Sequence, residues 1–178
     1  LDVVGELTIR GVRDAGTEIN GKNRDRVFDV HAGATLVVED VKIKDGKVDG
    51  ASGADGAGAV AGAGARLVAT GVRFESGDAS GDGGGVAILA GGSAALFDTE
   101  FESNDAGGHG GGIANLGGAL EVQRASFHRN DAGASGGGVF HAGGAGADLV
   151  NVTLYDNAAG AGGGAIATQG ALSLGQAT

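Results

Sequence analysis

Cysteine, proline, methionine and tryptophan are all absent from the 178 residues, and aromatic side chains make up only 4% of them. Without cysteine the chain forms neither a disulfide nor a thiolate metal site. The sequence also lacks any run of 18 apolar residues, so we expect no membrane-spanning segment. Too few large side chains are present to fill the closely packed centre of a conventional globule. A thin core of repeated small and medium-sized residues is therefore expected.

Positive charge is scarce as well: 12 lysine and arginine residues face 22 aspartate and glutamate residues, and the net charge is −10. Because nucleic acids are bound through clustered basic side chains, we expect no nucleic-acid partner. An acidic surface keeps a protein soluble and attracts divalent cations. Glycine is abundant, at 40 residues, but it does not recur at every third position, which together with the lack of proline excludes collagen.

A phrase of three glycines recurs at a nearly fixed interval. It begins at Gly83, Gly110, Gly136 and Gly162, which are 27, 26 and 26 residues apart. A second phrase ending in asparagine keeps the same step, at residues 101–104, 127–130 and 154–157. A period of this length indicates supersecondary units that bury their apolar faces only by stacking on one another. The repeat therefore sets the architecture.

Aligning the repeats gives rows of equivalent residues, and we call one of them the reference row. It consists of Ile43, Phe74, Phe101, Phe127 and Leu154. The positions two, five and seven residues earlier are also mostly apolar, whereas the position directly before is polar throughout. A step of two is the period of a strand, and the single step of three marks a bend. With a third short strand after each glycine triplet, the sequence predicts an all-β, single parallel β-helix (β-solenoid) with three strands per 26–27-residue coil and five to six coils. No segment shows the spacing of apolar residues that is typical of an amphipathic helix, so a helical fold is not predicted.

The position three residues after the reference row carries only glycine or asparagine. Its members are Gly46, Gly77, Asn104, Asn130 and Asn157. Both residue types tolerate a left-handed backbone, so we predict a turn with positive φ at this position. The asparagine side chains are predicted to form a hydrogen-bonded ladder, and the phenylalanines of the reference row to stack in the core.

We expect one β-helix domain over residues 1–178, with an irregular first coil at 1–25, regular coils at 26–178 and an extruded Gly/Ala loop at 49–58. The chain begins at Leu1 and shows no basic segment followed by an apolar run, so no signal peptide is predicted and the chain is expected to be a processed or excised piece. No capping segment is recognised at either end of the repeats. Two explanations stay open: the chain is a fragment, or its ends meet neighbouring copies and build a fibre.

One further row carries like charges. Asp78, Asp105 and Asp131 occupy it, and Lys47 takes the same position one coil earlier. Carboxylates stacked about 5 Å apart repel each other, so they either splay into water or share a hard cation. This row is the one predicted metal site, for Ca²⁺; no cofactor is required, and no catalytic or cofactor-binding residue is predicted. The four histidines share no row, which makes a metal site built from them alone unexpected.

The Gly-Gly-x-Ile/Val and Phe-x-x-Asn phrases resemble the repeats of chlamydial-type polymorphic outer-membrane proteins. Segments 5–11, 25–30, 33–36 and 41–43 are similar to secreted bacterial right-handed β-helix repeat proteins. The resemblance implies a right-handed solenoid that is extracellular or on the cell surface and is adhesive or structural. The chain departs from the pattern at Gly77, where the repeat would carry asparagine.

An enzyme is the alternative, because many parallel β-helices cleave acidic polysaccharides. Such chemistry needs a carboxylate pair, or Ca²⁺ with a basic residue, on one exposed sheet. Segment 108–110 (Gly-His-Gly) resembles a short motif of polygalacturonase-like hydrolases, but no accompanying aspartate pair is recognised. The sequence thus favours a structural protein, adhesin or filament subunit that binds itself end to end, or binds surface glycans or proteins. A lyase or hydrolase on acidic glycans is the alternative.

Overall fold

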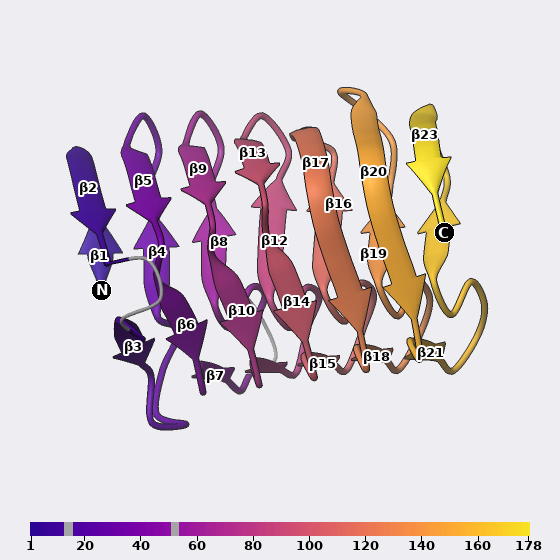
Figure 1. Ribbon diagram of the computed structural model, residues 1–178, viewed down its shortest axis with the longest axis horizontal. Coiled ribbons are helices and arrows are strands. Elements are labelled where there is room, and N and C mark those ends of the chain that lie inside the picture. The colour runs from indigo at the N-terminus through magenta and orange to yellow at the C-terminus, as the bar shows by residue number, and fades with distance from the viewer. Residues whose placement is uncertain (13–15, 51–53) are drawn as a thin grey trace.

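The computed structural model describes residues 1–12, 16–50 and 54–178, and it is built from strands with no helix among these residues. The strands stack as a parallel β-solenoid of about six turns. Figure 1 shows the coils side by side along the long axis, from β1 and β2 at one end to β23 at the other. Accordingly, no described segment is a helix long and apolar enough to cross a membrane.

Three sheets make up the solenoid, and the third spans only the coils from β7 to β21. The first contains β1 (Asp2–Val3), β4 (Phe28–Val30), β8 (Ala59–Ala61), β12 (Val86–Leu89), β16 (Ile113–Leu116), β19 (Val139–His141) and β22 (Ile166–Thr168). The second contains β2 (Glu6–Arg10), β3 (Glu18–Asn20), β5 (Thr35–Glu39), β6 (Lys42–Lys44), β9 (Arg66–Thr70), β10 (Arg73–Glu75), β13 (Ser93–Phe97), β14 (Glu100–Glu102), β17 (Ala119–His128), β20 (Ala147–Tyr155) and β23 (Leu172–Ala177). The third contains β7 (Lys47–Val48), β11 (Asp78–Ala79), β15 (Asp105–Ala106), β18 (Asp131–Ala132) and β21 (Ala158–Ala159).

The reference row is confirmed as a single interior row. Its five members pair in register from one coil to the next, all strands being parallel. Phe74, Phe101 and Phe127 are fully buried, and their rings stack at centroid distances of 4.9 and 4.8 Å. Such stacking adds about 0.5–1.5 kcal/mol per pair beyond burial. The row also reaches into the first coil, because Ile19 of β3 pairs with Ile43.

The predicted asparagine ladder is confirmed. The Nδ2 of Asn104 donates to the Oδ1 of Asn130, and the Nδ2 of Asn130 donates to the Oδ1 of Asn157, each over 2.9 Å. Each Nδ2 also donates to a phenylalanine carbonyl of the preceding coil, and each Oδ1 accepts a backbone N–H. The central residue, Asn130, thereby uses both side-chain N–H groups and accepts two hydrogen bonds inside the protein, where an unsatisfied polar group costs about 1–3 kcal/mol.

The prediction of positive φ at the same position is wrong by one residue. The left-handed residues directly precede this row, namely Asp45, Ser76, Ser103, Arg129 and Asp156, with φ between 51° and 55°. The glycines in the row have a different cause: a Cβ on Gly46 would lie 2.1 Å from the carbonyl oxygen of Ala57, and one on Gly77 would lie 2.1 Å from that of Gly84. The asparagines in this row instead form the side-chain hydrogen bonds of the ladder.

The glycine triplets are places where neighbouring coils come close. Their left-handed residues are Gly83, Gly110, Gly136 and Gly163, and Gly56 takes the same position one coil earlier. Of the range 49–58, residues 51–53 lie outside the described residues. Residues 54–58 lie within a coil: Ala57 is buried, and the N–H of Gly58 donates to the carbonyl of Gly85 over 2.9 Å.

We predict that alanine at Gly111 weakens the stacking. A Cβ there would lie 2.3 Å from the carbonyl oxygen of Asp131 and 2.6 Å from that of Gly137. The expected loss is about 1–3 kcal/mol of unfolding free energy, measured by urea denaturation. Gly162 is the matched control, because no atom lies within 4 Å of a Cβ there. Equal losses in Gly111→Ala and Gly162→Ala would contradict this explanation of the triplets.

Candidate functional site: the charged face of the second sheet

Chemically reactive side chains gather on the outer surface of the second sheet. The two residues that flank each member of the reference row point outward, because side chains alternate along a strand. We call this surface the charged face. It carries Lys42, Lys44, Arg73, Glu75, Glu100, Glu102, Ser126, His128, Thr153 and Tyr155.

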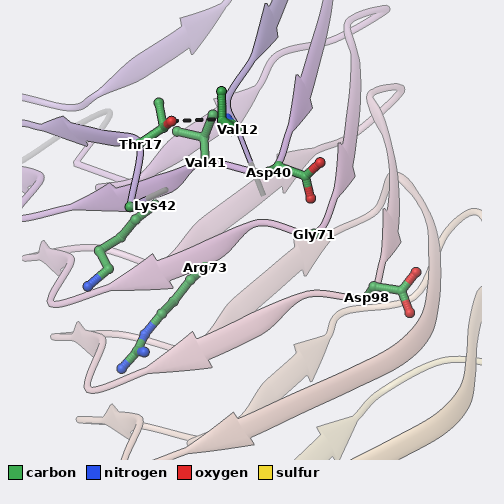
Figure 2. Close-up of a pocket in the computed structure, with 9 residues that line it drawn as sticks. Val12, Thr17, Asp40, Val41, Lys42, Gly71, Arg73 and Asp98 are labelled. Carbon is green, nitrogen blue, oxygen red and sulfur yellow. Dashed lines mark hydrogen bonds between the residues drawn. The ribbon is translucent and has the colours of Figure 1, made fainter. Parts of the chain in front are cut away.

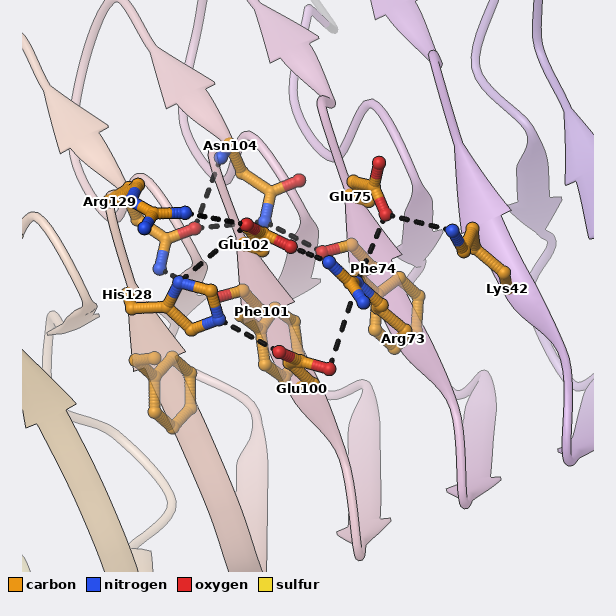
Figure 3. Close-up of polar contacts among 12 residues, drawn as sticks. Lys42, Arg73, Phe74, Glu75, Glu100, Phe101, Glu102, Asn104, His128 and Arg129 are labelled. Atoms are coloured by element: carbon orange, nitrogen blue, oxygen red, sulfur yellow. Dashed lines mark hydrogen bonds and ion pairs between the residues drawn. The ribbon is translucent and has the colours of Figure 1, made fainter. Parts of the chain in front are cut away.

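Arg73 is the centre of an ion-pair network on this face (Figure 3). Its Nε lies 3.0 Å from Glu75 and 3.6 Å from Glu100, and its Nη2 contacts Glu102. Lys42 approaches Glu75 to 3.2 Å from the preceding coil. These contacts arise because in-register stacking places Arg73 between a lysine and a glutamate of adjacent coils. Partly exposed ion pairs of this kind contribute little stability individually, about 0–1 kcal/mol.

His128 lies between two carboxylates. Its Nε2 is 2.8 Å from Oε1 of Glu100, and its Nδ1 is 3.9 Å from Oε1 of Glu102. The ring is stacked on Tyr155, with centroids 4.9 Å apart and planes 4° apart. Only 6% of the histidine side chain is exposed, and Nδ1 is buried with no hydrogen-bond partner. Arg129 reaches the same carboxylate of Glu102 from the solvent side, over 2.9 Å.

The network is electrically balanced when His128 is neutral. Its cations are Lys42, Arg73 and Arg129, and its anions are Glu75, Glu100 and Glu102. A balanced cluster exerts little attraction on distant ions, so any ligand must replace one of the existing partners.

A groove of about 510 Å³ adjoins the charged face and shares Lys42 and Arg73 with it. Figure 2 shows these two cations extending to one side of the groove, with Asp40 and Asp98 on the other side. Val12 also lines it, and its N–H donates to the hydroxyl of Thr17 over 3.1 Å. The groove therefore offers both signs of charge to a polar partner.

The structure brings the predicted aspartate row together on the third sheet. Asp78 pairs with Asp105 and Asp105 with Asp131, while Lys47 contacts Asp78 over 2.7 Å. Partial burial raises the pKa of Asp105, and the neighbouring charges of Asp131 and Asp78 add to the rise. The hydrogen bond and charge of Asp78 raise the pKa of Lys47. Calcium binding at this row stays a prediction.

Two other groups bring three potential metal ligands within 4.8 Å of one another in the described part of the chain: Asp2, Asp29 and His31; and Glu100, Glu102 and His128. Sequence reasoning missed both, because it compared the histidines only with each other. Glu102 and His128 share the row directly after the reference row, and pairing this row with acidic residues would have found them.

No family model, curated protein or solved structure matches this chain. The resemblance to polymorphic outer-membrane and secreted β-helix repeats therefore stays a prediction, and the function has to be argued from the geometry.

Asp105→Asn should stabilise the protein near neutral pH. Since the pKa of Asp105 is raised on folding, the folded state holds its proton more tightly, and this carboxyl lowers stability as pH rises above its unfolded pKa of about 3.9. We expect a gain of about 0.2–1 kcal/mol near pH 7 that disappears below about pH 3, where the carboxyl is protonated in both states.

Denaturant titrations at both pH values measure the difference. Asp78→Asn is the matched comparison, because it also removes the ion pair with Lys47 and should gain less. A gain for Asp105→Asn that persisted at the acidic pH would contradict the electrostatic cause. Repeating the series in millimolar Ca²⁺ tests the predicted cation site: an ion at this row would stabilise the natural chain more than Asp105→Asn.

Proposed function

We propose that this chain is an extracellular or cell-surface β-solenoid with a structural or adhesive role. The main support is the in-register pairing of its interior rows, because of which successive coils have the same cross-section. A rod of this kind displays the same outward positions at intervals of about 4.8 Å. Repeated outward rows suit a spacer or a binding surface, and the mixed charges around the groove suit surface glycans or proteins as partners.

The proposed mode of assembly is end to end, with a second copy of this chain. At one end of the described structure Leu7 and Ile9 of β2 are only partly buried, and at the other end Leu174 of β23 is 49% exposed with Leu172 partly buried. Leu7 and Leu172 belong to one interior row, and Ile9 and Leu174 to the next, as the strand pairing through the intervening coils shows. A second copy stacked on β23 would continue both rows. Its β2 would satisfy an open strand edge.

Self-association should therefore depend on Leu174. We expect the 178-residue chain to form concentration-dependent oligomers in light scattering, and Leu174→Lys to weaken them by placing a charge in the joint. Val68→Lys, on the side of the rod in β9, is the matched control and should leave association unchanged. A stable monomer at high concentration, or equal effects of the two lysines, would contradict end-to-end assembly.

One observation favours the second candidate function, a lyase or hydrolase on acidic glycans. Three glutamates, Glu75, Glu100 and Glu102, lie beside Arg73 on one partly exposed face. They supply the carboxylates that general acid–base cleavage requires. Against it, each of these carboxylates is already paired with a cation or with His128.

A panel of acidic polysaccharides separates the two functions. We expect no new reducing ends and no unsaturated products, with or without Ca²⁺, because the paired carboxylates are not poised to transfer protons. Glu102→Gln is the control for any activity that does appear. Products that require Glu102 would replace the structural or adhesive proposal with the enzyme.

A further inference from the structure

We propose that His128 and Glu102, supported by Glu100, form a binding site for a divalent transition-metal ion of the Zn²⁺ class. This site is separate from the aspartate row of the third sheet and independent of the proposed function. It follows from the ring nitrogens of His128 and the carboxylates that face them (Figure 3).

The first observation is a mismatch at His128. A neutral imidazole has one N–H and one lone pair, whereas an ionised carboxylate only accepts hydrogen bonds. The 2.8 Å contact assigns the N–H to Nε2, which donates to Glu100. In the neutral ring the lone pair is then on Nδ1, which lies 3.9 Å from Oε1 of Glu102 and is buried with no hydrogen-bond partner. Two electron pairs face each other, which is the arrangement that a cation relieves.

The second observation is the space between these two atoms. Zinc bonds measure about 2.0–2.1 Å to imidazole nitrogen and about 2.0–2.2 Å to carboxylate oxygen. Their sum slightly exceeds the 3.9 Å separation of Nδ1 and Oε1, so an ion can bond to both atoms from a position just off the line joining them. Water molecules would complete the coordination.

Glu100 completes the site without binding the metal directly. Its hydrogen bond to Nε2–H fixes the ring orientation and the tautomer, and it increases the basicity of the opposite nitrogen. Tyr155 stacks on the ring and limits its rotation. The histidine is therefore held with its lone pair toward Glu102 before any ion arrives.

Charge balance identifies the group that the ion must displace. Glu102 is already paired with Arg73 and Arg129. Arg73 also contacts Glu75 and Glu100, whereas the side chain of Arg129 is 61% exposed. Movement of Arg129 into solvent opens Glu102 at least cost. Arg129 thus competes with the metal, and the affinity for metal should rise when it is removed.

The ligand set favours Zn²⁺, Co²⁺, Ni²⁺ or Cu²⁺ over Ca²⁺ and Mg²⁺, because imidazole nitrogen suits the former and all-oxygen sets suit the latter. The other three-residue group provides an internal comparison. His31 is 48% exposed, and both carboxylates of its group approach the same ring nitrogen: Nε2 lies 3.0 Å from Asp2 and 3.9 Å from Asp29. Its ring is therefore neither buried nor held at both nitrogens.

Calorimetric titration of the full 178-residue chain with Zn²⁺ tests the site. We expect one site whose affinity falls at least about tenfold in His128→Gln and rises severalfold in Arg129→Gln. His31→Gln should leave this affinity unchanged, and excess Ca²⁺ should not compete. Circular dichroism of each variant shows whether it is folded.

A second measurement keeps the proposal testable if His128→Gln fails to fold. Co²⁺ added to the natural chain should shift the NMR signals of the His128 ring before those of His31, and Glu102→Gln should abolish the shift. Undetectable Zn²⁺ binding, binding lost only in His31→Gln, or weaker binding in Arg129→Gln would each overturn the proposal.

Discussion

Every feature of this protein depends on one constraint, the in-register parallel pairing of each coil with the next. Parallel hydrogen bonding fixes a spacing of about 4.8 Å and allows no sideways shift. Whatever residue occupies a position therefore meets the residue of the same position in both neighbouring coils. In the core this gives phenylalanine stacks with centroids 4.8 and 4.9 Å apart, and beside it the asparagine ladder.

The same constraint acts on charged residues. Where the sequence alternates sign along a row, as at Lys47 and Asp78, stacking produces an ion pair. Where it repeats one sign, as at Asp105 and Asp131, stacking produces repulsion and a raised pKa at Asp105. The charged face combines both cases, because Arg73 is in register with Lys42 on one side and with Glu100 on the other, while Glu75 is in register with Glu102. Its balance is thus a property of the rows and not of single pairs.

The sequence was sufficient for the solenoid because its period is explicit and its apolar rows repeat. It was also sufficient for the asparagine ladder, since that requires only one residue type in one row. The sequence did not locate the left-handed residues. The residue types of Ser76, Ser103 and Arg129 do not indicate a positive φ, whereas the glycines and asparagines that follow them do, although the structure does not place the left-handed conformation there. The row alignment does place His128 beside Glu102, but the direction of their long side chains, and so the contacts of His128 with Glu100 and Glu102, is not contained in it.

The asparagine ladder has a direction. In both asparagine–asparagine hydrogen bonds the side-chain N–H of one coil donates to the side-chain oxygen of the next coil, from Asn104 through Asn130 to Asn157. Aligned amide dipoles polarise one another, so the hydrogen bonds in the row strengthen cooperatively. The ladder consequently has two unlike ends: the Oδ1 of Asn104 accepts only from a backbone N–H, and the Nδ2 of Asn157 donates only to a backbone carbonyl. A coil inverted along the axis would meet donor with donor, which makes antiparallel joining of such ladders unfavourable.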